Sequence, residues 1–188
     1  IPVFILAGQS NMEGKAKLSL LEHQVQDPST KERFAHFHND GEWNVRDDVF
    51  IQFLDRSGKL TVGFGSPNCI GPELDFGFTV GDAMDPPVLL IKTAWGGKSL
   101  YRDFRPPSAG PPDATIVDNL LQQARKRNPE TTREQIVESF GASYRMMLEE
   151  IHRATSQIDQ LMPGQQNRSY RLAGFAWFQG WNDMVSKE

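Results

Sequence analysis

Residues 1–14 have the sequence IPVFILAGQSNMEG, and this stretch decides the fold. Its first part, residues 1–7, is an uninterrupted apolar run, which is typical of a strand buried on both faces of a parallel sheet. The run ends at Gly8, and Ser10 follows it closely. Open α/β sheets place their chemistry at the carboxyl ends of the strands. We therefore predict a parallel sheet with Ser10 at its functional edge, where the Ser10 N–H begins a helical turn.

The turn after this strand has two interpretations. Any turn from a strand to a helix favours Gly, Ser and Asn, because glycine tolerates positive φ and short polar side chains cap the helix. A nucleophilic serine needs the same position, with its hydroxyl exposed beside unpaired N–H groups. Both interpretations remain open on these residues alone.

Composition limits the classes of function. The chain has 188 residues, which suits one domain with a sizeable core. Its formal net charge of -4 gives no indication of a nucleic-acid or anionic-membrane surface. No stretch approaches the roughly 20 apolar residues of a membrane span. Cys69 is the only cysteine, so an intrachain disulfide is excluded.

Two later apolar runs also lead into small or polar residues. Residues 88–91 predict a second buried parallel strand, which ends in a loop with the sequence Trp-Gly-Gly at 95–97. Residues 170–178 predict a third buried strand, which leads to Gln179 and Asn182. If the strands are parallel, Ser10 and these residues meet at one edge of the sheet.

The rest of the chain predicts helices and a hairpin. Apolar runs at 49–54 and 60–64 around a glycine-containing turn predict a β-hairpin beside the main sheet. His36 and His38 alternate as a metal-binding pair on a strand would, but they lack a third ligand at recognisable spacing, so we interpret them as ordinary loop residues. Helical spacing and caps predict helices at about residues 18–25, 72–83, 116–127 and 133–155. Thr132 followed by Gln135 predicts a capping box at the start of the last of them.

Two short blocks carry a family resemblance. The sequence GQSNM at 8–12 resembles the nucleophile block of the SGNH-hydrolase superfamily, in its carbohydrate O-acetylesterase branch of sialate O-acetylesterase-like and acetylxylan-esterase-like domains. The sequence GWND at 180–183 resembles the third block of that superfamily. The loop WGGKSL at 95–100 also resembles the acetylesterase branch. The resemblance extends over residues 3–183, and it depends mainly on the first and third blocks together.

The resemblance implies a fold and an activity. The expected fold is α/β, a three-layer α/β/α sandwich with a central parallel sheet of SGNH or flavodoxin-like type, formed by a single domain over residues 1–188. The expected activity is that of a secreted or periplasmic serine esterase without metal or cofactor. Its substrate would be acetylated carbohydrate of the sialic acid or xylan type.

The resemblance also implies roles for individual residues. Ser10 would be the nucleophile, and Gly71 and Asn182 would donate to the oxyanion. Gly71 equally suits a glycine needed only for backbone conformation before a helix. Many members of the branch carry Gln-Gly-Glu in the third block, so Gln179 and Asn182 are both candidates for the side-chain donor. The implied substrate-binding residues are Gln9, Asn11, Trp95, Gly96, Gly97 and Gln179.

The general base is the missing element. The superfamily takes it from an Asp-x-x-His element near the C-terminus, and no histidine of this chain has an aspartate three residues before it. We expect either that the domain lacks its C-terminal segment, with the His and Asp beyond residue 188, or that it is catalytically incomplete. The alternative functions are a carbohydrate-binding pseudo-esterase without turnover and a flavodoxin-like scaffold domain. No oligomeric state is predicted.

Overall fold

The computed structural model describes residues 1–185, which form a five-stranded sheet of order β6-β5-β8-β1-β9. Strand β1 (Pro2–Gly8) runs parallel to both of its neighbours, β8 (Val88–Ala94) and β9 (Arg171–Phe178). The predicted trio of parallel strands is therefore confirmed. As the sequence required, the carboxyl ends of these strands meet at one edge of the sheet.

The predicted hairpin is part of the main sheet, and the prediction that it lies beside the sheet was wrong. Strand β5 (Val49–Phe53) pairs in parallel with β8, with Val49 opposite Val88. Its partner β6 (Arg56–Lys59) is antiparallel to it and ends before residue 60. Every residue of β5 is buried, as expected for a strand covered on both faces.

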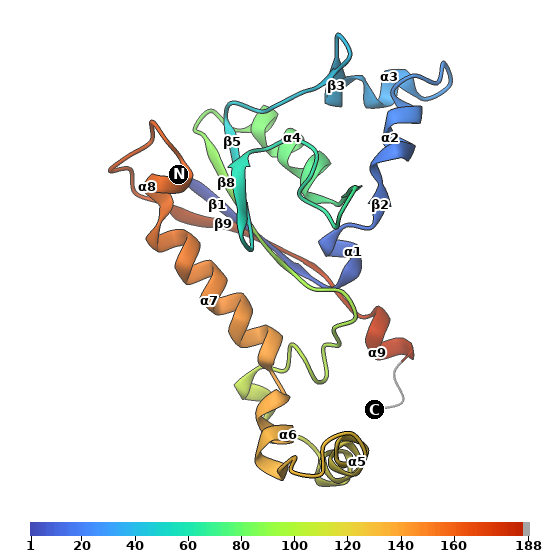
Figure 1. Cartoon of the computed structure of the whole chain (residues 1–188). Helices are drawn as coiled ribbons and strands as arrows, with labels where there is room; N and C mark the ends of the chain where they lie inside the picture. The colour runs from blue at the N-terminus through green and yellow to red at the C-terminus, as the bar shows by residue number, and fades with distance from the viewer. Residues whose placement is uncertain (186–188) are drawn as a thin grey trace.

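Helices cover both faces of the sheet (Figure 1). On one face, Leu6 packs in a core with Leu74 of α4 (Glu73–Ala83). On the other face, Ile5 packs in a core with Met147 of α7 (Ala142–Ser156). Alternate residues of β1 thus enter opposite cores, as the period of a strand demands. The predicted three-layer α/β/α fold is confirmed.

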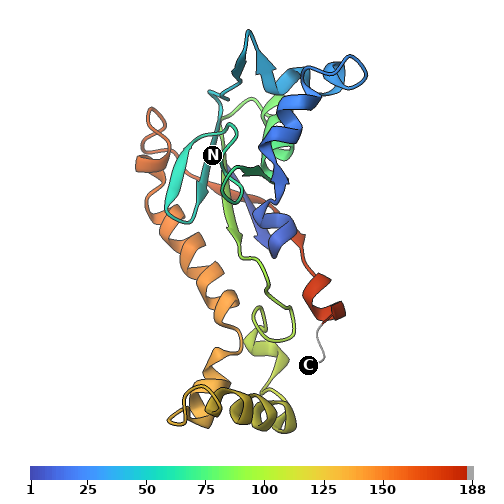
Figure 2. The ribbon, with the colours of Figure 1, turned by 45° about the vertical axis from the view of Figure 1, so that its right-hand side comes forward.

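The remaining elements are mostly short. Figure 2 shows α5 (Ala114–Arg125) and α6 (Arg133–Ser139) beyond the end of the sheet at which α1 (Ser10–Glu13) and α9 (Trp181–Val185) also lie. A small apolar cluster of their own holds α5 and α6 together. The helices are α1 (Ser10–Glu13), α2 (Leu18–Gln24), α3 (Lys31–Phe34), α5 (Ala114–Arg125), α6 (Arg133–Ser139), α8 (Ile158–Leu161) and α9 (Trp181–Val185), with 3-10 turns at Ala35–Phe37 and Pro107–Ala109. The short strands are β2 (Ala16–Lys17), β3 (His38–Asn39), β4 (Glu42–Trp43) and β7 (Cys69–Ile70).

The single helix predicted for residues 133–155 is two helices, and Gly141 separates them. Gly141 has φ +73°, and its N–H donates to the carbonyl oxygen of Arg102 at 2.7 Å. A Cβ at this position would lie 2.5 Å from the carbonyl oxygen of Arg105. The chain therefore turns here, so that α6 packs on α5 while α7 packs on the sheet. The capping box predicted at Thr132 is confirmed.

Strand β9 is an edge strand, so the prediction that it is buried was wrong for the part of the chain that the structure describes. Leu172 is 63% exposed and Phe175 is 55% exposed. Only β1 pairs with β9 among residues 1–185. Its apolar composition is that of an interior strand, whereas its position is at the border of the described sheet.

Candidate active site

The site begins where β1 and β9 end together. The Gln9 N–H donates to the carbonyl oxygen of Phe178 at 3.1 Å. Gly8, with φ +151°, lies so close to β9 that a Cβ would be 2.8 Å from the carbonyl carbon of Phe178. Ser10 is the first residue of α1, as the sequence predicted. The end of β1 therefore holds Ser10 in a fixed place at the sheet edge.

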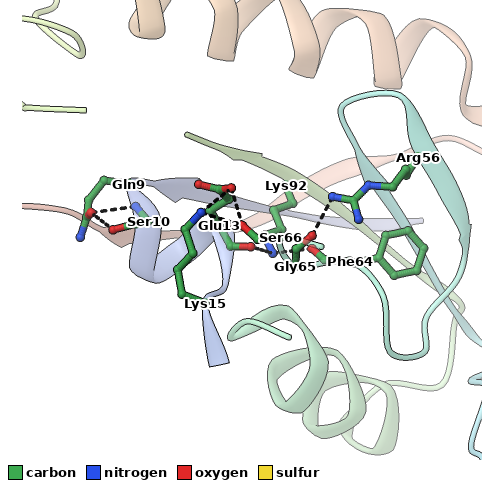
Figure 3. Close-up of polar contacts among 9 residues, drawn as sticks. All are labelled: Gln9, Ser10, Glu13, Lys15, Arg56, Phe64, Gly65, Ser66 and Lys92. Carbon is green, nitrogen blue, oxygen red and sulfur yellow. Dashed lines mark hydrogen bonds and ion pairs between the residues drawn. The ribbon is translucent and has the colours of Figure 1, made fainter. Parts of the chain in front are cut away.

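The buried side chain of Gln9 organises the donors around Ser10. Its Oε1 atom accepts hydrogen bonds from the Ser10 N–H at 2.7 Å and from the Ser10 hydroxyl (Figure 3). The same oxygen accepts a longer hydrogen bond, of 3.4 Å, from Nδ2 of Asn182. Groups of Ser10 and Asn182 thus converge on one carbonyl oxygen, although the two residues are far apart in the sequence.

The two amide candidates of the third block have different environments. Nδ2 of Asn182, on α9, donates to the carbonyl oxygen of Lys98 at 2.9 Å in addition to its contact with Gln9. Nε2 of Gln179 donates to the same Lys98 oxygen at 2.8 Å. Among the described residues, the Gln179 side chain makes no hydrogen bond to Gln9 or Ser10. Asn182 is therefore the amide that joins the cluster around Ser10.

The loop after β8 lies beside Ser10, as predicted. The Trp95 N–H donates to the carbonyl oxygen of Gly8 at 3.2 Å, which fixes the start of the loop. A Cβ added to Gly96 would lie 3.7 Å from the Ser10 Cβ, whereas one added to Gly97 would meet nothing within 4 Å. The Trp95 ring lies 6.1 Å from the ring of Phe104, which belongs to the core on the α7 side.

Gly71 lies next to α1, but its N–H has another partner. It donates to Oε1 of Glu73 at 2.9 Å, at the start of α4. In this structure the N–H is therefore engaged and does not serve as an oxyanion donor. A Cβ on Gly71 would lie 2.8 Å from the Cα of Gly14, so a close approach of two backbones requires glycine here. The geometry favours the conformational interpretation of Gly71.

Two hollows are bordered by residues of the site. One, of about 410 Å³, is bordered by Asn11, Gly71 and Phe178 among others. The other, of about 440 Å³, is bordered by Asn182 and by Gly97 of the Trp-Gly-Gly loop. The larger hollow is lined by Gly97, Lys98, Ser99, Arg102, Asp103, Asn182 and Val185. The exposed Asn11 thus lies at the border of a hollow that a substrate could occupy.

Asp183 is a residue of the site that the sequence analysis did not single out. Its carboxylate accepts hydrogen bonds from the N–H groups of Leu100, at 2.8 Å, and Tyr101, at 2.7 Å. These bonds attach α9, and with it Asn182, to the loop after β8. Asp183 belongs to the block at 180–183 that resembles the family, and this was the one signal in the sequence that it matters. Its role could not be predicted, because its hydrogen-bond donors lie more than 80 residues away in the chain.

No histidine joins Ser10 among residues 1–185. His23 lies 3.4 Å from Asp27, and His36 lies 3.4 Å from Asp75. His36 is in a 3-10 turn and His38 begins β3, so they are not alternate residues of one strand. In the same part of the chain, no group of three or more His, Cys, Asp or Glu side chains is placed to hold a metal ion.

Glu13 is an ionised carboxylate at the other end of α1. Partial burial would raise its pKa, but hydrogen bonds from the Ser66 hydroxyl, at 2.6 Å, and from Nζ of Lys15, at 2.9 Å, outweigh that effect. The pKa of Glu13 is consequently lower than its usual 4.5. Its carboxylate links α1 to the loop that contains Ser66 (Figure 3).

Comparison with solved structures gives a match of low sequence identity. A protein of Arabidopsis thaliana, known from an X-ray structure at 1.6 Å resolution, matches with 14% sequence identity and a TM-score of 0.48. The match covers 98% of this chain and 59% of the Arabidopsis chain, so this chain spans little more than half the length of that protein. No curated protein matches the chain. Among the described residues, no helix is long and apolar enough to cross a membrane.

Comparison with protein families gives a match over the whole chain. The family described as carbohydrate esterase, sialic acid-specific acetylesterase, matches residues 1–188. This agrees with the resemblance of the blocks at 8–12 and 180–183, which lie side by side in the structure. The chain belongs to the carbohydrate esterase family of sialic acid-specific acetylesterases.

Proposed function

We propose that this protein is a serine esterase that removes O-acetyl groups from carbohydrate, with Ser10 as its nucleophile. The observation that carries the proposal is the convergence of the Ser10 N–H, the Ser10 hydroxyl and Nδ2 of Asn182 on Oε1 of Gln9. Two N–H donors directed at one carbonyl oxygen beside a serine hydroxyl form the arrangement that acyl transfer needs.

In the proposed reaction, a substrate carbonyl takes the place of the Gln9 carbonyl. The Gln9 side chain turns away, and the acetyl carbonyl oxygen receives hydrogen bonds from the Ser10 N–H and from Asn182. Ser10 Oγ attacks the acetyl carbon, the bond to the sugar oxygen breaks, and the sugar leaves with a proton. Water then hydrolyses the acetyl-serine and releases acetate. One oxyanion donor contributes about 3–4 kcal/mol to such a step.

The proton of the Ser10 hydroxyl needs an acceptor. Positioned general-base catalysis contributes roughly 10²–10⁴-fold, and an Asp-oriented histidine is the usual base for a serine nucleophile. The described residues around Ser10 include no such histidine. The proposal therefore requires a His–Asp pair from outside residues 1–185 of this structure.

The hollow beside Asn182 supports a sugar as the substrate. Lys98, Ser99 and Arg102 border it and carry hydroxyl, ammonium and guanidinium groups that suit a polyhydroxylated ligand. Asn182, whose amide would hold the acetyl oxygen, lines the same hollow. Both classes named by the resemblance, acetylated sialic acid and acetylated xylan, are therefore substrates to test.

Acetate release by the natural-length protein tests the proposal. We expect turnover of O-acetylated sialic acid or of acetylated xylo-oligosaccharide, and loss of that turnover in Ser10→Ala. We expect Asn182→Ala to lower kcat by about 10²–10³-fold, as for the loss of one oxyanion donor. If the protein binds these sugars and releases no acetate from them, the esterase proposal is wrong and the pseudo-esterase alternative holds.

A further inference from the structure

Lys92 is a fully buried cation directly beneath the Ser10 turn. It is the fifth residue of β8, on the side of the sheet that faces α4, and its side chain is 0% exposed. Its Nζ donates to Oε2 of Glu73 at 2.6 Å, to the carbonyl oxygen of Phe64 at 2.7 Å and to that of Glu13 at 2.8 Å. An ammonium group has three donors, so Lys92 has an acceptor for each of them.

The surroundings of Lys92 fix its position. Burial lowers the pKa of Lys92, and the charge and hydrogen bond of Glu73 oppose that change only in part. Its Nζ also lies 4.5 Å from the centroid of the Phe53 ring, in a cation–π contact. A buried charge persists only where it is paired and its hydrogen bonds are made. Lys92 satisfies both conditions, so its position is determined by four separate segments of the chain.

One of those segments is the turn that carries the nucleophile. The Glu13 carbonyl lies at the end of α1, and the Gly14 N–H next to it donates to the carbonyl oxygen of Ser10 at 3.0 Å. Lys92 therefore holds the peptide group that closes the turn begun by Ser10. Figure 3 shows the Lys92 side chain reaching this turn and the loop of Phe64.

The partner of Lys92 holds the other side. Glu73 uses one oxygen for Lys92 and the other for the Gly71 N–H, at 2.9 Å. A Cβ on Gly14 would lie 2.6 Å from the Cα of Gly71, so the two glycine backbones are in direct contact above the ion pair. The ion pair thus fixes the Gly71 loop against the closing residue of the Ser10 turn.

We propose that Lys92 and Glu73 are positioning residues for Ser10: their buried ion pair holds the nucleophile turn and the Gly71 loop in register at the edge of the sheet. The inference depends on the proposed function in one respect, namely that Ser10 is the nucleophile. Neither residue touches the reacting atoms. They act on Ser10 through the carbonyl of Glu13 and the backbone of Gly71.

The test uses a double variant that removes the charge pair without leaving an unpaired buried charge. Lys92→Met with Glu73→Gln in the natural-length protein retains side-chain volume and an oxygen that can accept from Gly71, but it removes the bonds to Glu13 and Phe64. Replacement of a buried ion pair by neutral groups is often tolerated, so the variant is expected to fold. Arg46→Met is the control, since it removes another paired cation that lies over an aromatic ring of the same core, here Phe78.

Hydrogen exchange and serine labelling are then measured on both variants. In the double variant we expect amides of residues 10–14 to exchange about tenfold faster or more, the factor implied by loss of one hydrogen bond to a charged group. Amides inside β1 and β8 should keep their protection. The rate of fluorophosphonate labelling and kcat should fall by about 10²-fold, as for a small misplacement of a reacting group, with KM unchanged. Arg46→Met should leave the exchange of residues 10–14 and the labelling rate unchanged.

Two results would overturn the inference. Unchanged exchange at residues 10–14 in the double variant would show that the pair does not hold the turn. Equal acceleration in the turn and in the strands would show that the pair only supports the fold. Labelling of the wild-type protein tests the proposed function separately: if Ser10 is never labelled, that proposal is wrong, while the exchange pattern still decides what the ion pair holds.

Discussion

Oε1 of Gln9 accepts both hydrogen bonds that Ser10 donates, one from its N–H and one from its hydroxyl. The side chain is almost completely buried, at 1% exposure, so it fills space inside the site rather than facing solvent. Gln9 is thus the N-cap of α1 and also occupies the place that the proposed mechanism assigns to a substrate carbonyl.

Replacement of Gln9 by alanine separates these two roles. Gln9→Ala should lower the free energy of unfolding by about 1–2 kcal/mol, because α1 loses its cap. It should not slow the labelling of Ser10, because the competing carbonyl oxygen is removed with the side chain. Urea unfolding and the rate of fluorophosphonate labelling measure the two effects.

An exposed glutamine provides the control. Gln122→Ala on the outer side of α5 should change the free energy of unfolding by less than about 0.5 kcal/mol. A tenfold loss of labelling rate in a folded Gln9→Ala protein would contradict the proposed step in which a substrate carbonyl takes the place of the Gln9 carbonyl.

Removal of the Asp183 carboxylate should detach α9 from the loop after β8. Asp183→Ala leaves the N–H groups of Leu100 and Tyr101 without their charged acceptor, and it should destabilise the protein by about 1–3 kcal/mol. Asn182 moves with α9, so kcat of the esterase should fall as well. Asp118→Ala, which breaks an exposed ion pair with Arg133, should cost less than about 1 kcal/mol. Equal effects of the two substitutions would show that Asp183 is an ordinary surface residue.

Gly141→Ala should be among the more destabilising small substitutions. Positive φ alone costs an alanine about 1–2 kcal/mol, and the clash with the carbonyl of Arg105 adds about 1 kcal/mol or more. Gly41→Ala measures the cost of positive φ alone, because Gly41 has φ +89° and an added Cβ would meet nothing within 4 Å. Chemical unfolding of the two alanine variants should therefore differ by at least about 1 kcal/mol. Equal losses would show that the backbone at residue 141 moves freely away from Arg105.

Glu13 should make part of the stability depend on pH. Its pKa in the folded protein is below the usual 4.5, so the folded protein binds this proton more weakly than the unfolded chain does. Its stabilising contribution is complete above the usual value and is lost as the pH falls through the lower, folded value. The free-energy difference between wild type and Glu13→Gln, about 1 kcal/mol or less, should shrink in acid. A difference that stayed constant on acidification would contradict the assigned hydrogen bonds.

The sequence predicted the elements whose signals are local. The apolar run before Gly8, the runs that became β8 and β9, and the cap at Thr132 each depend on neighbouring residues, and each is confirmed. The break at Gly141 was missed because apolar spacing continues across it. What ends the helix there is a contact with Arg102 and Arg105, distant in the chain.

The sequence predicted the positions of site residues that belong to recognisable blocks. It did not predict positions or partners that depend on single long-range contacts. Ser10, Asn182 and the Trp-Gly-Gly loop meet as expected because parallel strands place their ends together. The N–H of Gly71 was expected to face the oxyanion, yet it binds Glu73. Lys92 comes directly after the apolar run at 88–91, where a polar residue usually begins a loop. Its burial was missed because its three hydrogen-bond acceptors come from three other segments of the chain, and no local pattern reveals them.

The central claim is that Ser10 is an activated nucleophile, and a mass measurement tests it most directly. The natural-length protein is treated with a fluorophosphonate probe, and its intact mass is compared with that of treated Ser10→Ala. The proposed function predicts a single adduct on the wild-type protein and none on the variant. A wild-type protein that stays unlabelled, or an adduct that persists in Ser10→Ala, would contradict it.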